Sequence, residues 1–242
     1  MAGRVLVVGA GGQLGRKICD TFVSRNWLTF GADVHFPAPA ASPMVQIDVG
    51  KVRHEDQGKF LISALRSHER IGATGKIDAV VNVAGGFAMG TAAEEAVLSA
   101  SKNMVESSLY TSIIAAHVAC HTLRTGGLVV LPGAAAAFSP TPWSLPYGTA
   151  KVAVHHLVRS LDETSGLPAK AKTVGLAPQT LDTPQNRAAM PDADHATWAS
   201  LEEVAEQIAA WCSDPEALQG GHVYLIQKGK GAAASFEPRT PL

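Results

Sequence analysis

Short apolar runs rich in β-branched residues recur along the chain, and the segments between them have the spacing of amphipathic helices. The runs lie at residues 4–9, 27–33, 44–48, 76–85, 126–133, 171–178 and 221–227. Strands that are apolar on both sides belong to a sheet covered on both faces, and helices between them make such a sheet mostly parallel. The sequence therefore predicts an α/β fold with a doubly wound sheet in three αβα layers.

The intervening segments predict helices at residues 13–25, 53–68, 93–123, 147–163 and 201–212. We expect a proline-rich loop at 35–43 and assign no fold to the tail at 229–242, where structural signals are weak. With 242 residues, of which 46% are hydrophobic, the chain can bury one sizeable core. We expect a single domain, residues 1–242.

Charge and cysteine content restrict the class of partner. Twenty lysines and arginines nearly balance 21 aspartates and glutamates, without a basic or acidic block. This balance argues against a nucleic acid or a membrane surface and favours a small-molecule ligand. Three distant cysteines indicate a reducing compartment, and we find neither a signal peptide nor a membrane span. The expected location is cytoplasmic.

The first strand runs into the glycine-rich turn "GAGGQLG", which is typical of dinucleotide binding. Gly9 allows the tight turn, Gly12 allows the backbone to approach a pyrophosphate, and Gly15 allows the helix to pack on the sheet. Gln13 and Leu14 belong to the same turn. A bare strand-to-helix turn is the alternative interpretation.

Asp33 ends the second strand, 18 residues beyond Gly15, near the offset of an acid that binds the adenosine ribose of NAD. Its carboxylate would repel a 2′-phosphate, so NADH is the expected cofactor; Arg16 and His35 leave NADPH possible. Asp48 is expected either to accept from the adenine amino group or to cap a helix. After the fourth strand, small residues would let the nucleotide lie on the backbone: Ala84, Gly85 and Gly86.

Tyr147 and Lys151 are four residues apart and share one helical face. We expect Lys151 to lower the pKa of the Tyr147 phenol towards that of a working general acid and to bind the nicotinamide ribose. The pair alone would more simply be a surface feature of a helix. The dinucleotide turn upstream favours the catalytic interpretation.

The motifs "GAGGQLG", "NVAGG" and "YGTAK" stand in the order and spacing of the short-chain dehydrogenase/reductase family, which the chain resembles over nearly its whole length. That family carries a serine about a dozen residues before the tyrosine, and this chain has Ala134 there. Ser108 is the nearest match to the family's helix asparagine. A lost oxyanion donor typically costs about a hundred- to a thousandfold in turnover. The substrate should therefore need little carbonyl activation.

The chain resembles most closely a branch of the family that reduces pterins, above all in "TLDTPQNRAAMPDAD" (180–194). The resemblance implies reduction of quinonoid 6,7-dihydropteridines with NADH, and a homodimer built on helices 93–123 and 147–163. It places Pro178, Thr180 and Leu181 near the nicotinamide. The substrate would meet Phe87, Ala134, Tyr147, Asn186 and Met190. Phe87 stands where this branch has tryptophan, and Met89 interrupts its paired glycines.

Some residues have a simpler interpretation beside a functional one. His117 and His121 have the spacing of a metal pair but lack a third ligand, so we expect packing and no metal. His155 and His156 are expected at a subunit surface, and Trp198, Trp211 and Cys19 in the core or under a lid. Two other functions stay open: an NADPH-dependent pteridine or carbonyl reductase, and a non-catalytic dinucleotide-binding regulator.

Overall fold

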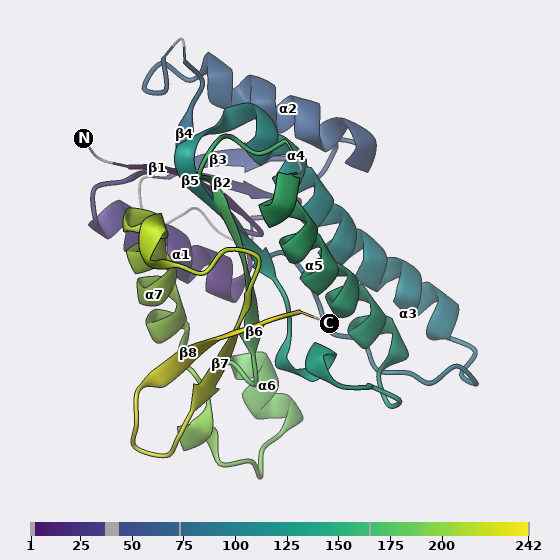
Figure 1. Ribbon diagram of the computed structural model, residues 1–242. Coiled ribbons are helices and arrows are strands. Elements are labelled where there is room, and N and C mark those ends of the chain that lie inside the picture. Colours follow the sequence, from purple (N-terminus) through teal and green to yellow (C-terminus); the bar gives the residue numbers. More distant parts are fainter. Residues whose placement is uncertain (1–2, 37–43, 73, 165, 242) are drawn as a thin grey trace.

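The computed structural model describes residues 3–36, 44–72, 74–164 and 166–241, and within them the strands form one eight-stranded sheet (Figure 1). The order is β3-β2-β1-β4-β5-β6-β7-β8, and only β8 is antiparallel to its neighbour among these strands. Chain reversal between β1 and β4 makes the sheet doubly wound, as predicted. The strands are β1 (Arg4–Val8), β2 (Leu28–Asp33), β3 (Val45–Asp48), β4 (Ile77–Asn82), β5 (Leu123–Pro132), β6 (Lys172–Pro178), β7 (Val223–Lys228) and β8 (Ala234–Arg239).

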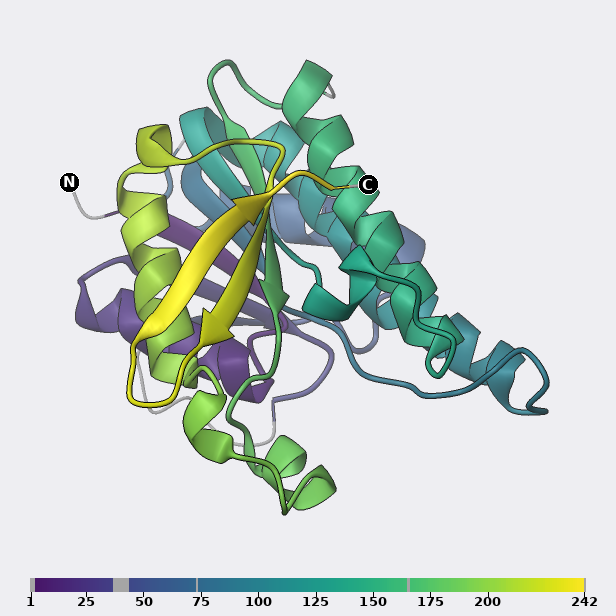
Figure 2. The same cartoon turned by 60° about the horizontal axis from the view of Figure 1, so that its bottom comes forward.

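Helices cover both faces of the sheet, which gives three layers (Figures 1 and 2). Alternation along β1 sends Leu6 into the core beneath α2, α4 and α5, and Val7 into the core beneath α1 and α7. The helices are α1 (Gln13–Ser24), α2 (His54–Ser67), α3 (Val97–Met104), α4 (Thr111–Thr122), α5 (Leu145–Thr164), α6 (Pro184–Ala189) and α7 (Leu201–Ser213). A π-helical segment, η1 (Val105–Tyr110), joins α3 to α4.

The predicted strands and helices are confirmed, with boundaries shifted by a few residues. The long helix expected at 93–123 begins at Val97 and contains the η1 segment, because the hydroxyls of Thr111 and Ser112 bond back to backbone carbonyls of that turn. Residues 37–43 of the expected proline-rich loop lie outside the described residues. Helix α6 and strand β8 were not predicted.

Glu203 holds the C-terminal tail, residues 229–242, to which the sequence analysis assigned no fold. Its carboxylate accepts from the Lys228 ammonium on β7 and from the Ala234 amide at the start of β8, both within 3.1 Å. It also completes a capping box with Ser200 at the start of α7. Burial alone would raise the pKa of Glu203, but these hydrogen bonds outweigh it and lower the pKa to about 2.

We expect Glu203→Gln to lower the free energy of unfolding by about 1 to 3 kcal/mol near neutral pH, because the Lys228 ammonium and the Ala234 amide lose a charged acceptor. Since the pKa of Glu203 is lowered in the folded state, its contribution is present above about pH 4.5 and is lost as the pH falls towards 2. Denaturant unfolding across this range measures both effects. Glu202→Gln, on the exposed side of the same helix turn, is the control and should have a smaller effect. Equal losses in the two variants would contradict the assignment.

Candidate functional site

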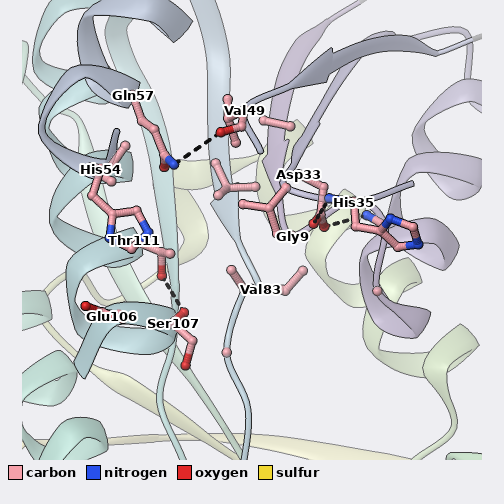
Figure 3. A pocket seen from close by; sticks show the side chains of 18 of the residues that line it. Gly9, Asp33, His35, Val49, His54, Gln57, Val83, Glu106, Ser107 and Thr111 are labelled. Atoms are coloured by element: carbon pink, nitrogen blue, oxygen red, sulfur yellow. Dashed lines mark hydrogen bonds between the residues drawn. The ribbon is translucent and has the colours of Figure 1, made fainter. Parts of the chain in front are cut away.

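A cavity of about 630 Å³ opens at the carboxyl ends of β1, β2 and β4, at the switch point of the sheet (Figure 3). Ligands of doubly wound sheets bind at this position. Five predicted cofactor residues line it: Gly9, Gly12, Asp33, Ala84 and Gly85.

The glycine-rich turn forms one wall. Gly9 has φ +85° and lies so close to the backbone of Ala84 that a side chain would clash with it. Gly15 packs against the carbonyl of Gly9, which seats α1 on the turn as predicted. Gly12 precedes α1 as its N-cap residue, so amides at the start of α1 are available to a phosphate.

Asp33 faces the cavity from the end of β2. Its Oδ2 accepts from the amide of Gly11 at 2.7 Å, and its Oδ1 accepts from the amide of His35 at 3.1 Å (Figure 3). A carboxylate oxygen has two lone-pair sites, so both oxygens can still accept from ribose hydroxyls. Gly11, which the sequence reasoning did not select, fixes the orientation of this carboxylate.

The opposite wall comes from α2 and from the α3–η1–α4 rod, and Figure 3 shows its side chains facing Asp33 across the cavity. The polar members not anticipated from sequence are His54, Gln57, Asn103, Glu106, Ser107 and Thr111. They come from distant segments, and no motif links them. The η1 segment was the available signal: hydroxyl-rich "ESSLYTS" favours the local backbone bonding that opens a π turn.

Asn82 holds the loop that carries Ala84 and Gly85. It is fully buried at the end of β4; its amide nitrogen donates to the Ser112 hydroxyl at 3.1 Å, and its oxygen accepts from the Ala84 amide at 2.9 Å. One side chain thus ties the cofactor loop to the start of α4. Ser108, also fully buried, leaves its hydroxyl without a hydrogen-bond partner among the described residues, close to Gly85.

Tyr147 and Lys151 lie on α5, with the Lys151 Nζ 5.7 Å from the centre of the Tyr147 ring. Lys151 is buried, its Nζ approaches Gly85, and it donates to the Pro132 carbonyl at the end of β5 at 2.8 Å. Lys151 therefore lies beside Gly85, which lines the cavity, although neither residue of the pair is itself part of the lining.

The expectation that Lys151 lowers the pKa of Tyr147 is wrong for this structure. Burial raises the pKa of Tyr147 to about 12 and lowers the pKa of Lys151 to about 8. The ammonium donates to the Pro132 carbonyl and lies 5.7 Å from the centre of the Tyr147 ring, and desolvation is the cause of the raised pKa of Tyr147. Tyr147 is accordingly a protonated phenol at neutral pH.

Ala134, expected to meet the substrate, is only 1% exposed. Its amide donates to Nε2 of His155 at 3.1 Å. His155, expected at a subunit surface, is 3% exposed within the chain itself, because this bond and the Phe138 ring hold it inside. That prediction is wrong for His155, whereas the neighbouring His156 is exposed.

An aromatic surface lies beside Tyr147. The ring centre of Phe87 is 5.0 Å from that of Tyr147 and 6.2 Å from that of Trp143. Phe87 is 58% and Trp143 46% exposed, so both present open faces. The Ser144 hydroxyl donates to the Ala88 carbonyl at 2.6 Å and holds the two loops together. Sequence reasoning selected Phe87 and missed Trp143.

Other predicted residues lie elsewhere. In both views α6, which begins the segment of Asn186 and Met190, lies apart from α5 (Figures 1 and 2). The Asn186 side chain donates to the Leu181 carbonyl within its own segment, and Met190 is exposed. The remaining predicted cofactor residues do not line the cavity: Gln13, Leu14, Gly15, Asp48, Gly86, Lys151, Pro178, Thr180 and Leu181.

Asp48 does not cap a helix, because its carboxylate accepts from the Gly50 amide and Arg53 is the N-cap residue of α2. Trp198, Trp211 and Cys19 are buried, as predicted. His117 and His121 pack edge to face with ring centres 4.7 Å apart, and no cluster of three or more potential metal ligands occurs among the described residues. No helix in the described ranges is long and apolar enough to cross a membrane.

Comparisons with known proteins give a family, relatives and a fold. The model of the short chain dehydrogenase family matches residues 4–194. A dihydropteridine reductase from Dictyostelium discoideum is 35% identical over 233 residues, 95% of this chain and 97% of the relative. A short-chain dehydrogenase/reductase from Serratia marcescens has a TM-score of 0.76 at 21% identity, covering 95% of this chain and 98% of that one. BdcA, solved in complex with NADPH, has a TM-score of 0.74 at 19% identity, with coverages of 96% and 95%.

Proposed function

Because the chain belongs to the short chain dehydrogenase family, we propose that this oxidoreductase transfers hydride from NADH to quinonoid 6,7-dihydropteridines such as quinonoid dihydrobiopterin, regenerating the tetrahydropterin. The similarity to a dihydropteridine reductase over 95% of the chain supports the substrate class. We infer one catalytic domain, residues 1–242, since both cores share one sheet.

One observation carries the proposal: Tyr147 and Lys151 are retained while the family's serine position holds Ala134, whose side chain offers no donor and is buried. A ketone reductase would need that donor, at a cost of about a hundred- to a thousandfold without it. A quinonoid pterin is an electron-poor conjugated ring and accepts hydride without carbonyl polarisation. Positioning and one proton donor then suffice.

The cavity fits the adenosine half of NADH. Asp33 would accept from the ribose hydroxyls, and its fixed negative charge would disfavour the 2′-phosphate of NADPH. Amides at the start of α1 would hold the pyrophosphate. NADH supplies the hydride when bound. Lys151 keeps donors beyond the one that bonds the Pro132 carbonyl, and they would bind the nicotinamide ribose.

The chain's own residues supply the proton and the orientation. The pKa of the Tyr147 phenol is raised to about 12, so the phenol is protonated and can donate throughout the neutral pH range. Phe87 and Trp143 offer exposed ring faces beside that hydroxyl, on which a flat pterin would lie. The segment of Asn186 and Met190 would have to move towards α5 to cover the substrate.

Steady-state NADH oxidation with chemically generated quinonoid dihydropterin tests the proposal. We expect turnover with NADH, at least tenfold weaker kcat/KM with NADPH, and no turnover of a simple ketone. A preference for NADPH and a ketone would favour the carbonyl reductase alternative. Tight NADH binding without turnover of any of these would favour a regulator.

We expect Trp143→Ala to raise the KM for the dihydropterin about two- to thirteenfold with little change in kcat, because one stacking face contributes roughly 0.5 to 1.5 kcal/mol beyond its buried area. Trp143→Phe should recover most of the affinity. Trp27→Phe, remote from Tyr147, is the control. Unchanged KM in Trp143→Ala would contradict the aromatic surface as the substrate site.

We also propose a homodimer. Exposed apolar side chains on the α3–η1–α4 rod and on the adjoining α5 support it: Leu98, Val105, Ile113 and Val152. Val105→Asp should shift the sedimentation coefficient from dimer to monomer, because a charge would be buried at the interface. Phe60→Asp on α2, equally exposed but outside this surface, should stay dimeric. A monomeric wild-type chain would contradict the proposal.

A further inference from the structure

We propose that His155 is a positioning residue: its imidazole anchors the end of β5 to α5 and thereby fixes Lys151 and Tyr147 for the reaction. The inference rests on the proposed function for its kinetic consequence and on contacts in the structure for its geometry. Nothing in the family motifs of the sequence pointed to this histidine, which we had expected on a surface.

Two hydrogen bonds one helical turn apart join α5 to Pro132 and Ala134 at the end of β5. Lys151 donates to the Pro132 carbonyl at 2.8 Å, and His155 accepts from the Ala134 amide at 3.1 Å. Tyr147, Lys151 and His155 follow one another at four-residue intervals and so lie along one side of α5, where Lys151 and His155 reach the end of β5. The helix therefore holds this strand end by two side chains of opposite hydrogen-bonding character.

The residues around the His155 imidazole leave it almost no exposed surface. A side chain on Gly133 would meet the His155 Nε2 at 2.5 Å, so only glycine fits between the strand end and the ring. The ring centre of Phe138 lies 4.9 Å away. The imidazole has to be neutral at Nε2 in order to accept, and burial together with the Lys151 charge lowers the pKa of His155 to about 4.

The anchor has a specific task in this chain. The Ala134 amide is buried, and a buried amide without a partner is costly. The methyl side chain of Ala134 cannot hydrogen-bond to the backbone of its own loop. The acceptor for the Ala134 amide therefore comes from another element, and His155 on α5 provides it. Losing the bond would free Gly133 and Ala134 and, through the Pro132 carbonyl, the position of the Lys151 ammonium.

The test compares three variants of the full chain: His155→Leu, which removes the acceptor; His155→Gln, whose amide oxygen can take the place of Nε2; and His156→Leu, the exposed neighbour. All assays are run well below the melting temperature of each variant. They measure NADH binding, kcat and KM with quinonoid dihydropterin, and amide hydrogen exchange of residues 130–140. We expect His155→Leu to bind NADH but to lose kcat about ten- to a hundredfold, since small misplacements cost this much. Exchange at 133–135 should accelerate at least tenfold.

His155→Gln should keep kcat and exchange within about threefold of wild type, and His156→Leu should equal wild type. The inference is overturned if folded His155→Leu keeps wild-type kcat and exchange, or if His155→Gln is as impaired as His155→Leu. If His155→Leu fails to fold, kcat and amide exchange of His155→Gln decide: values within about threefold of wild type support the anchor, and a loss of kcat with faster exchange contradicts it. If the wild-type protein does not reduce the dihydropterin, the proposed function fails, and the exchange rates still decide whether His155 anchors the strand end.

Discussion

Replacing Tyr147 with phenylalanine is expected to lower kcat for quinonoid dihydropterin about a hundred- to ten thousandfold, the usual contribution of a positioned proton donor. The phenol is the acidic group next to the aromatic surface of Phe87, and burial keeps it protonated. NADH affinity and melting temperature should stay unchanged, because the Tyr147 hydroxyl is not one of the groups lining the adenosine cavity. Rapid-mixing assays at saturating NADH measure the loss.

Tyr224→Phe is the matched control. That hydroxyl accepts from the Gln219 amide at 2.9 Å beside β7, away from the cavity, so its removal should affect stability and leave kcat within about twofold. If Tyr147→Phe retained wild-type kcat, the proton would have to come from solvent, and Tyr147 would lose its assigned role.

Replacing Asp33 with asparagine is expected to reduce the preference for NADH over NADPH at least tenfold. The change removes the charge that repels a 2′-phosphate and weakens the charge-assisted bonds to the ribose, which are worth about 1.5 to 3 kcal/mol. The amide oxygen can still accept from Gly11, so the turn should keep its shape. The ratio of kcat/KM for the two cofactors measures the effect.

Asp48→Asn serves as the control for Asp33. The Asp48 carboxylate is exposed and accepts from the Gly50 amide outside the lining of the cavity. We expect the cofactor ratio to stay within about twofold. A shift equal to that of Asp33→Asn would revive the sequence-based prediction that Asp48 contacts the adenine.

The fold could be predicted from the sequence because most of its strands are continuous apolar runs buried on both sides, as in β1, β2 and β4. Strand β8 could not be, because its burial alternates weakly and its place depends on the bonds from Glu203 and on pairing with β7. Tertiary contacts of this kind leave little local signal. Helix α6 is six residues long and starts with a threonine cap, Thr183, inside an irregular segment.

The site was predictable where a motif fixes the backbone. Gly9, Gly15 and Asp33 occupy the places that the turn implies, since their roles follow from local conformation. The wall formed by His54, Gln57 and Glu106 was not, because it arises only when α2 and η1 line the same cavity. Trp143 likewise joins Phe87 through a bridge between distant loops, Gly90 with Ser144.

The spacing of Tyr147 and Lys151 gave a wrong prediction for the pKa of Tyr147. Four residues on a helix place Lys151 on the same face, but burial and the Pro132 carbonyl decide where its ammonium points. Desolvation then dominates the phenol. The same strand end explains His155: a polar residue that spacing alone puts on a helix face becomes an interior acceptor because Ala134 leaves a buried amide to satisfy.

A single-turnover measurement tests the central claim most directly. Enzyme saturated with NADH is mixed with a smaller amount of quinonoid dihydropterin, and in parallel with its 7,8-dihydro isomer, while NADH absorbance is followed. We predict a rapid loss of NADH equal to the quinonoid pterin added, at a rate no slower than kcat, and no loss with the isomer. No loss of bound NADH with the quinonoid species would contradict the account.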